Sequence, residues 1–188
     1  MRNLPTLFAG AAFAVAVLTG CTETDAPGSA ASPRATPAPT HYPLPARPVR
    51  PGETPITSAP VDDGDTRFQV IGLQKGLEGF FGSHAEWKAK GQYVVVRIVA
   101  ENPGRTNSRF DAKRQRLIAA DGKTYGIDRF AQAIKRQPDT LPLGAGVRIE
   151  MDLWFDIPEG TKVSAIKLFG DPPLGVVGET RGVQVTLP

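Results

Sequence analysis

Residues 148–157 alternate between two kinds of side chain. The apolar positions are Ile149, Met151, Leu153, Phe155 and Ile157, and the positions between them are Arg148, Glu150, Asp152, Trp154 and Asp156. Successive side chains of a strand point to opposite faces, so this period of two predicts a strand with one face in a core and the other toward solvent. A strand with one apolar face needs a second layer to cover that face, which points to a layered β architecture.

Most of the C-terminal two thirds of the chain shows the same kind of pattern. Residues 92–100 contain three consecutive valines and are apolar on both faces, as in a central strand. Further strands are expected at 67–70, 110–120, 123–127, 163–169 and 182–187. Asp121-Gly122 is expected to form a two-residue hairpin turn, and only residues 129–136 suggest a helix, of one or two turns. About seven strands without a βαβ rhythm predict an all-β, antiparallel immunoglobulin-like sandwich over residues 66–188.

The first twenty residues have the features of an export signal. A short basic start is followed by an uncharged run of apolar and small residues up to Gly20. Leu18-Thr19-Gly20-Cys21 then resembles the lipobox of bacterial lipoproteins, and Cys21 is the one cysteine of the chain. We therefore expect cleavage between Gly20 and Cys21 and a lipid on the Cys21 thiol. The protein would then be held on the extracytoplasmic side of the cell membrane without spanning it.

Residues 21–65 differ in composition from the rest of the chain. Ten of the 18 prolines fall here, among Ala, Thr, Ser and Gly. Such a segment has little to bury, so we expect a disordered, proline-rich linker between the lipid and the folded domain. Threonines beside prolines leave O-glycosylation of this linker open.

Four short motifs carry a resemblance to a known family. They are Asn102-Pro-Gly104, Asp121-Gly-Lys-Thr-Tyr125, Leu143-Gly144 and Leu153-Trp-Phe-Asp-Ile-Pro158. Together with the lipobox and the linker, they make residues 65–188 similar to the immunoglobulin-like domain of unknown function found on Gram-positive, actinobacterial lipoproteins. A more distant similarity is to the small secreted immunogenic antigens of mycobacteria. The resemblance implies a sandwich fold and an envelope location, and it brings no catalytic residues. Because the domain has no cysteine pair, its two sheets are expected to be held by apolar burial alone.

Composition leaves little room for catalysis. One Cys and two His exclude a multi-cysteine metal site and nearly exclude His-based chemistry. His84 next to Ser83 is more simply an exposed residue than half of a nucleophilic pair. Glu150, Asp152 and Asp156 suggest either paired carboxylates for glycoside hydrolysis or part of a Ca²⁺ site, and each is more simply part of a solvated strand face. We expect no enzyme, no metal and no cofactor.

Two groups of residues remain as candidate binding sites. Six basic residues fall within nineteen positions: Arg105, Arg109, Lys113, Arg114, Arg116 and Lys123. They form either a solvated face or a site for an anionic envelope component, with Arg114 and Arg116 expected on one strand face. Nucleic acid is an implausible partner for an exported protein.

The other group is an expected loop over residues 75–87 with three aromatic residues. Phe80, Phe81 and Trp87 lie there among glycines, where they would either plug the end of the core or contact a partner. Trp154 presents the same choice between packing and exposure. The sequence thus predicts a lipid-anchored, non-catalytic binding module of the cell envelope, or alternatively a structural or accessory subunit of an envelope complex. It does not identify the partner.

Overall fold

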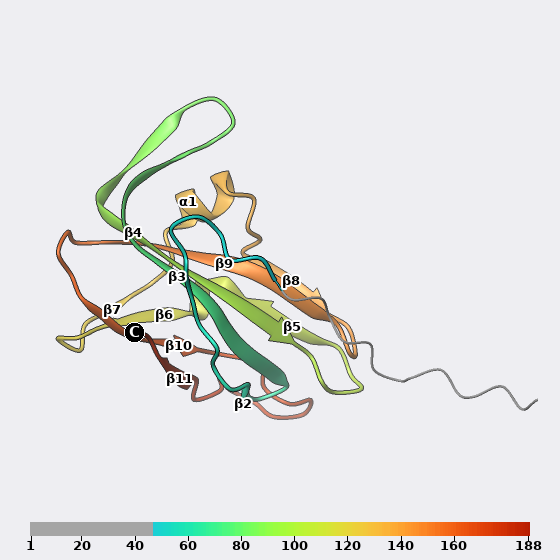
Figure 1. Cartoon of the computed structure of the whole chain (residues 1–188). Coiled ribbons are helices and arrows are strands. Elements are labelled where there is room, and N and C mark those ends of the chain that lie inside the picture. The colour runs from blue at the N-terminus through green and yellow to red at the C-terminus, as the bar shows by residue number, and fades with distance from the viewer. Residues whose placement is uncertain (1–46) are drawn as a thin grey trace, which may run out of the picture. The chain divides into compact units, whose positions relative to one another are not determined.

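The computed structural model describes residues 47–188, which form two main antiparallel sheets and one short α-helix (Figure 1). The expected signal peptide, the cleavage between Gly20 and Cys21, the lipidation of Cys21 and the linker up to residue 46 lie outside the described residues.

The first sheet contains the longest strands. Its order is β1 (Thr54–Pro55), β3 (Thr66–Phe81), β4 (Glu86–Glu101) and β9 (Arg148–Ile157), and β2 (Val61–Asp63) also pairs with β3. β4 lies between β3 and β9 and is buried from Tyr93 to Ala100. The prediction of a central strand over 92–100 is therefore confirmed.

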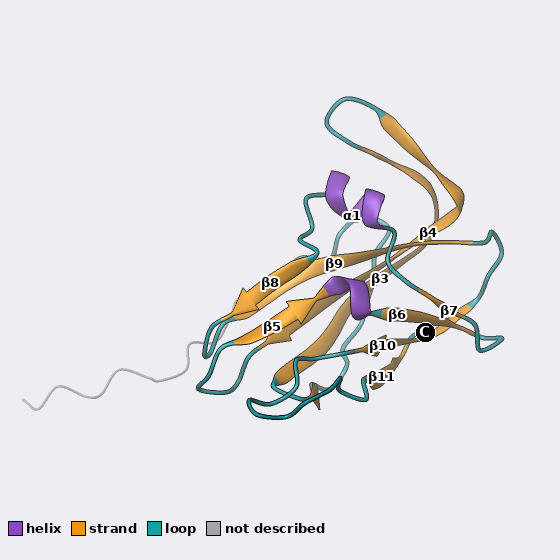
Figure 2. Ribbon diagram, turned by 180° about the vertical axis from the view of Figure 1, so that it is seen from behind, coloured by secondary structure: helices purple, strands orange, loops and turns teal. Residues whose placement is uncertain are grey.

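The second sheet lies against the first. Its order is β11 (Val183–Thr186), β10 (Val163–Leu168), β6 (Arg116–Ala119) and β7 (Thr124–Tyr125). A separate two-stranded ribbon pairs β5 (Ser108–Asp111) with β8 (Thr140–Leu143). All pairs are antiparallel, and Figure 2 shows the two layers from behind. The prediction of an all-β antiparallel sandwich is confirmed, with eleven strands among residues 47–188 in place of the seven or so expected.

The main core lies between the two sheets. Phe68 and Phe110 are fully buried there and meet edge to face, with ring centroids 6.2 Å apart. Leu153 and Phe155 of β9 are also fully buried in this cluster, as the alternation predicted. Apolar contact across the two sheets is the main favourable term that holds such a sandwich together.

The outer face of β9 differs from the prediction. Asp152 was expected to face solvent, but only 7% of its surface is exposed. Trp154, for which the sequence left packing and exposure open, is only 5% exposed. Two segments cover this face: helix α1 (Arg129–Ile134) near Trp154, and the chain around Arg50 near Asp152. The first sheet is therefore buried on both faces along β9.

The predicted strand over 110–120 is wrong as a single element. β5 ends at Asp111, a 3₁₀ turn η1 (Ala112–Arg114) follows, and the chain then enters the other sheet as β6. The Asp111 carboxylate accepts the Lys113 N–H (2.9 Å), which caps the turn. Arg114 and Arg116 therefore do not share a strand face, because Arg114 lies in the turn.

The hairpin after β6 is confirmed, but its loop has three residues and not two. The Ala119 carbonyl accepts the Gly122 N–H (2.9 Å), and the Ala119 N–H donates to the Lys123 carbonyl (2.8 Å). Gly122 has φ +83°, a left-handed conformation that glycine adopts without strain. A type I turn followed by a left-handed residue is the usual three-residue hairpin connection.

The boundary expected at residue 66 lies inside the folded unit. β1 pairs Thr54 with Leu73, and β2 pairs Val61 with Phe68, so residues 54–63 contribute strands to the first sheet. Residues 47–65 therefore belong to the domain and not to a disordered linker. Their prolines are compatible with this role, because Pro55 lies in a two-residue edge strand where no further ladder partner is needed.

The sandwich has two distinct ends. At one end of the sandwich, β3 begins, β4 ends and β9 begins. We call it the near end, because the first described residue, Arg47, lies there and pairs with Glu150. The β3–β4 hairpin projects beyond the sandwich at the opposite end, called the hairpin end, where α1 lies beside it (Figure 1). The two ends carry different side chains.

Candidate functional site

The predicted aromatic loop is the tip of the β3–β4 hairpin. Its strands run to Phe81 and resume at Glu86, so only residues 82–85 form the connecting turn. Phe80 and Phe81 point to opposite faces of the hairpin: Phe80 is buried, whereas Phe81 is 75% exposed. Sequence reasoning found these residues but predicted a loop. Two of the three glycines that suggested it, Gly76 and Gly79, lie within β3 at register shifts that bend the strand, and the third, Gly82, begins the turn.

A second apolar cluster supports this hairpin. Phe80 stacks against Tyr93 (centroids 5.2 Å apart) and Trp154 (5.1 Å) on the outer face of the first sheet. Ala131 of α1 closes the cluster from above, and the Lys135 ammonium lies 5.3 Å from the Trp154 ring centroid. Trp154 is therefore a packing residue, and the hairpin is attached to a rigid base.

Helix α1 is fixed to the edge of β9. The Asp128 carboxylate accepts the Ala131 N–H (2.7 Å) and so caps the helix, while the Asp128 N–H donates to the Trp154 carbonyl (2.7 Å). The buried Gln132 side chain donates to the Asp152 carbonyl (2.9 Å) and accepts the Trp154 N–H (3.0 Å). These bonds hold the helix in one position beside the hairpin.

Three exposed aromatic residues lie at the hairpin end, on the hairpin and on α1. Trp87 and Phe130 stack edge to face with centroids 4.8 Å apart, and they remain 38% and 49% exposed. Phe81 lies next to Ile134 and Arg136 at the rim of a shallow hollow of about 230 Å³. We call Phe81, Trp87 and Phe130 the aromatic patch.

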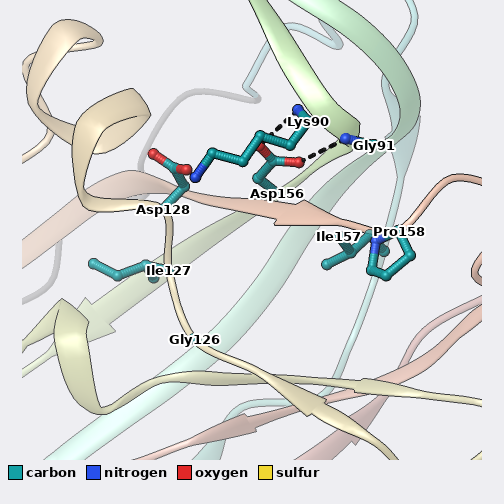
Figure 3. A pocket seen from close by; sticks show the side chains of 8 residues that line it. All are labelled: Lys90, Gly91, Gly126, Ile127, Asp128, Asp156, Ile157 and Pro158. Carbon is teal, nitrogen blue, oxygen red and sulfur yellow. Dashed lines mark hydrogen bonds between the residues drawn. The ribbon is translucent and has the colours of Figure 1, made fainter.

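A larger pocket lies between the start of α1 and the end of β9 (Figure 3). It has a volume of about 400 Å³, and Asp128, Asp156 and Lys90 contribute its charged groups. Asp156 accepts the backbone N–H groups of Lys90 (2.9 Å) and Gly91 (3.2 Å), and the Lys90 side chain extends toward Asp128. The pocket thus brings Asp128 and Asp156 together, but their charges already have partners.

Tyr93 shows the electrostatic effect of these carboxylates. Burial, followed by the negative charges of Asp128 and Asp156, raises the pKa of Tyr93 to about 12. The phenol therefore remains neutral throughout the physiological range.

The carboxylates Glu150 and Asp152 are occupied by arginines. Arg50 donates two bonds to the Asp152 carboxylate (2.6 and 2.8 Å), and Arg97 donates through Nε to Glu150 (2.5 Å). Paired in this way, Glu150 and Asp152 are not arranged as a free acid and base. Within residues 47–188, no group of three His, Cys, Asp or Glu side chains could hold a metal ion.

Glu53 completes this ionic network and was not found from the sequence. Its carboxylate accepts Arg97 Nη1 (3.0 Å) and the Arg50 N–H (2.9 Å), and the side chains of Glu53 and Arg97 are only 4% and 6% exposed. Gly72 leaves room for it, since a Cβ there would collide with the Glu53 carboxylate. Glu53 lies in the segment predicted to be a linker, so no local pattern could have identified it.

The six predicted basic residues do not form one surface. Three of them are bound within the chain: Arg114 donates to the Gly170 carbonyl (2.8 Å), Arg116 to the Lys113 carbonyl (2.6 Å), and Lys123 pairs with Asp121 (3.0 Å). The hydrogen bond between Lys123 and Asp121 raises the pKa of the lysine and lowers that of the aspartate.

The other three basic residues, Arg105, Arg109 and Lys113, are exposed. Arg109 and Lys113 lie near the loop that follows β10, because the Arg109 N–H donates to Asp171 (2.8 Å) and Lys113 precedes Arg114. The predicted cluster therefore reduces to a smaller group beside that loop. Among residues 47–188, no helix has the length and apolar character needed to cross a membrane.

Solved structures resemble this fold at low sequence identity. A conserved hypothetical protein from Bacillus anthracis aligns with a TM-score of 0.46 and 11% identity, over 63% of this chain and 92% of that one. A functionally unknown protein from Listeria monocytogenes EGD-e aligns with a TM-score of 0.47 and 15% identity, over 72% of this chain and 87% of that one. No protein with a curated description matches the chain.

A family model matches residues 57–176, which begin within the segment that joins β1 to β2 and end after β10. The match covers more than half of the chain and nearly the whole sandwich. The chain therefore belongs to the family described as "Domain of unknown function (DUF4352)".

Proposed function

We propose that the chain is a lipid-anchored protein of the bacterial cell envelope whose domain binds a protein partner, without catalysis, through the aromatic patch. The observation that carries the binding role is the exposure of three aromatic side chains at the hairpin end: Phe81 on one face of the hairpin tip, and Trp87 in contact with Phe130 of α1. Large exposed aromatic groups that are held in place are typical of protein interfaces.

The supporting structure favours binding over core packing for these three side chains. Phe80, one residue from Phe81, fills the place under the hairpin against Tyr93 and Trp154. The inner position is therefore already occupied by Phe80, and the three outer rings contribute contact area that costs little side-chain entropy to order.

The anchoring part of the proposal rests on the junction Leu18-Thr19-Gly20-Cys21. Acyl chains on a single cysteine hold a protein stably at a bilayer, because each buried CH₂ contributes about 0.8 kcal/mol. Cys21→Ala is expected to abolish labelling of the full chain by radioactive fatty acid. Labelling that persists in this variant would contradict anchoring at Cys21.

The non-catalytic part is supported by how the acidic side chains are used. Glu150 and Asp152 pair with arginines, and Asp156 accepts two backbone N–H groups. None of the three is left as a free carboxylate in a hollow, which is what an acid or base needs in order to meet a substrate.

Photo-crosslinking of the full chain in intact cells tests the patch. A photoreactive phenylalanine analogue replaces Phe81 in one strain and Phe130 in another, and the matched control carries it at Val147, which is 40% exposed at the near end. We expect the same protein adduct from positions 81 and 130 and its absence from position 147. If positions 81 and 130 give no adduct that position 147 lacks, the patch is not an interface.

Detergent extraction without crosslinking separates the binding module from the alternative of an accessory subunit. A subunit of a stable complex would keep its partner through detergent extraction without crosslinking, whereas a reversible binder would lose it. Because the aromatic patch is small compared with the interfaces of obligate complexes, we favour reversible binding.

A further inference from the structure

The loop of residues 171–182, between β10 and β11, exposes three apolar side chains at its tip. Leu174, Val176 and Val177 are 86%, 57% and 100% exposed. The Pro173 carbonyl accepts the Val176 N–H (2.9 Å) around Gly175, whose φ is +85°, so Leu174 lies at the corner of a tight turn. No part of the described domain covers these side chains.

We propose that the 171–182 loop is a membrane-contact loop, whose apolar tip enters the headgroup region of an anionic bilayer. The inference deepens the anchoring part of the proposed function and rests on it. It assigns to the domain a second contact with the membrane, separate from the lipid.

The base of the loop is closed by side chains from two other parts of the fold. Arg114 donates to the Gly170 carbonyl (2.8 Å) and to Thr180 Oγ1 (3.3 Å), so it bridges the two ends of the loop. The Asp63 carboxylate accepts the N–H groups of Gly170 (2.8 Å) and Gly182 (3.1 Å). A loop that is closed at its base in this way projects its tip away from the core.

Basic side chains surround the closed base. Arg109, Lys113 and Arg181 are exposed, and the Arg109 N–H donates to Asp171 at the start of the loop. The acidic Glu179 lies 3.9 Å from Arg114. Apolar residues beside exposed cations match the interface of an anionic bilayer, where the apolar groups leave water and the cations meet headgroup phosphates. A soluble anionic polymer would not account for the apolar tip.

The loop lies at the end of the domain from which a tether would run. The Asp65 N–H donates to the Asp171 carbonyl (2.8 Å), so the loop is next to the start of β3, at the near end where Arg47 also lies. About 25 residues separate Arg47 from Cys21. A segment of that length can span any distance up to roughly 80–90 Å, which allows the near end to reach the bilayer that holds the lipid.

Depth-dependent quenching tests the loop in the lipidated full chain. Because Cys21 is the one cysteine and its sulfur carries the lipid, Val177→Cys provides a single site for a thiol-reactive fluorophore. The matched control is Phe81→Cys, which is also a largely exposed position but lies at the hairpin end. Both proteins are reconstituted into vesicles with spin-labelled lipid, made from phosphatidylglycerol and phosphatidylethanolamine or from phosphatidylcholine alone.

We expect strong quenching at position 177 in the anionic vesicles, weak quenching there in phosphatidylcholine, and none at position 81 in either. Lys113→Ser with Arg181→Ser is expected to weaken loop binding roughly 30-fold, because each basic residue near an anionic surface contributes about fivefold. These variants should leave the melting temperature unchanged, since both side chains are exposed.

Other results would overturn the inference in distinguishable ways. Chains that sediment with the vesicles while position 177 stays unquenched refute the loop contact and leave the anchor intact. Chains that fail to sediment with anionic vesicles refute both, since neither lipid nor loop then holds them. Equal quenching in both lipids refutes the role of the basic residues. A response of the position 177 probe to soluble polyphosphate without vesicles assigns the loop to a dissolved anion instead of a bilayer.

Discussion

Arg97 shows how a single side chain ties distant parts of the chain together. It lies in the central strand β4 with a side chain only 6% exposed, and it pairs with Glu53 from the N-terminal segment and Glu150 from β9. A buried ion pair is weak evidence for net stability, but the removal of one partner leaves the other charge buried without compensation. Removal of Arg97 should therefore lower the stability of the fold by more than removal of an exposed charge would.

Arg97→Ala is expected to lower the free energy of unfolding by about 3–5 kcal/mol, because Glu53 would be left buried and unpaired. The measurement is urea denaturation followed by circular dichroism. Arg67→Ala is the control, since Arg67 pairs with the exposed Asp62 and should change stability by less than about 1 kcal/mol. Equal effects of the two substitutions would show that burial of the Arg97 pair does not matter.

Tyr93 makes the fold sensitive to alkaline pH. Its pKa in the folded state is about 12, above the ordinary value of 10. Below pH 10 the phenol is protonated in both states and its stabilising effect is complete, whereas above pH 10 the unfolded state loses its proton first. Stability is thus expected to fall between pH 10 and 12. Tyr93→Phe should flatten this part of a denaturation-midpoint profile, and an unchanged slope would rule out Tyr93 as its source.

The residues of β9 show what the sequence can and cannot predict. Alternation correctly placed Leu153 and Phe155 in the core, because an apolar face needs cover from the other sheet. It failed for Asp152, which the local pattern placed in solvent, and it left Trp154 open between packing and exposure. Their partners Arg50 and Gln132 come from outside the strand, and no alternation within ten residues contains that information.

At the scale of elements, β9 contributes fully buried apolar side chains to the core between the two sheets. Phe155→Ala is expected to cost about 3–5 kcal/mol and Leu153→Ala about 2–5 kcal/mol, because both side chains are fully buried between the sheets. Calorimetric unfolding would measure both. Asp152→Ala is expected to be more destabilising than an ordinary surface substitution, since Arg50 binds that carboxylate through two hydrogen bonds.

The N-terminal segment, residues 47–65, contains two strands that amino-acid composition did not predict. Proline content predicted disorder up to residue 65, and that property does not exclude short edge strands such as β1 and β2. The predicted strand over 110–120 failed for a related reason. Hydrophobic pattern continues through it, but the Gln115 side chain bonds to the carbonyls of Asp111 and Phe169, which holds the turn between two sheets.

Truncation tests whether residues 47–65 belong to the fold or form a linker. A chain that begins at residue 66 lacks β1, β2 and Glu53, so it leaves Arg97 without one of its partners. We expect its melting temperature to fall by roughly 10 °C or more relative to a chain that begins at residue 46. Equal melting temperatures would mean that residues 47–65 add nothing to the fold.

At the scale of the whole molecule, the sequence predicted the class of fold but not the arrangement of its sites. Two of the basic residues, Arg105 and Arg109, lie toward the near end of the sandwich, whereas the aromatic patch lies at the hairpin end. Strand periodicity carries no information about which end a turn occupies. The 171–182 loop was also missed, because Leu174 and Val177 have no period that marks them as exposed.

The two glutamine bonds to β9 have a consequence for association between molecules. β9 is the last strand of its sheet, and an open last strand offers unpaired N–H and C=O groups to any other chain. Gln132 supplies those groups with an amide that imitates the backbone of a neighbouring strand. If the chain is held on a membrane, as proposed, it meets its copies often, within two dimensions. Because Gln132 already bonds to the backbone at this edge, such copies can lie close together without fibre-like pairing through β9.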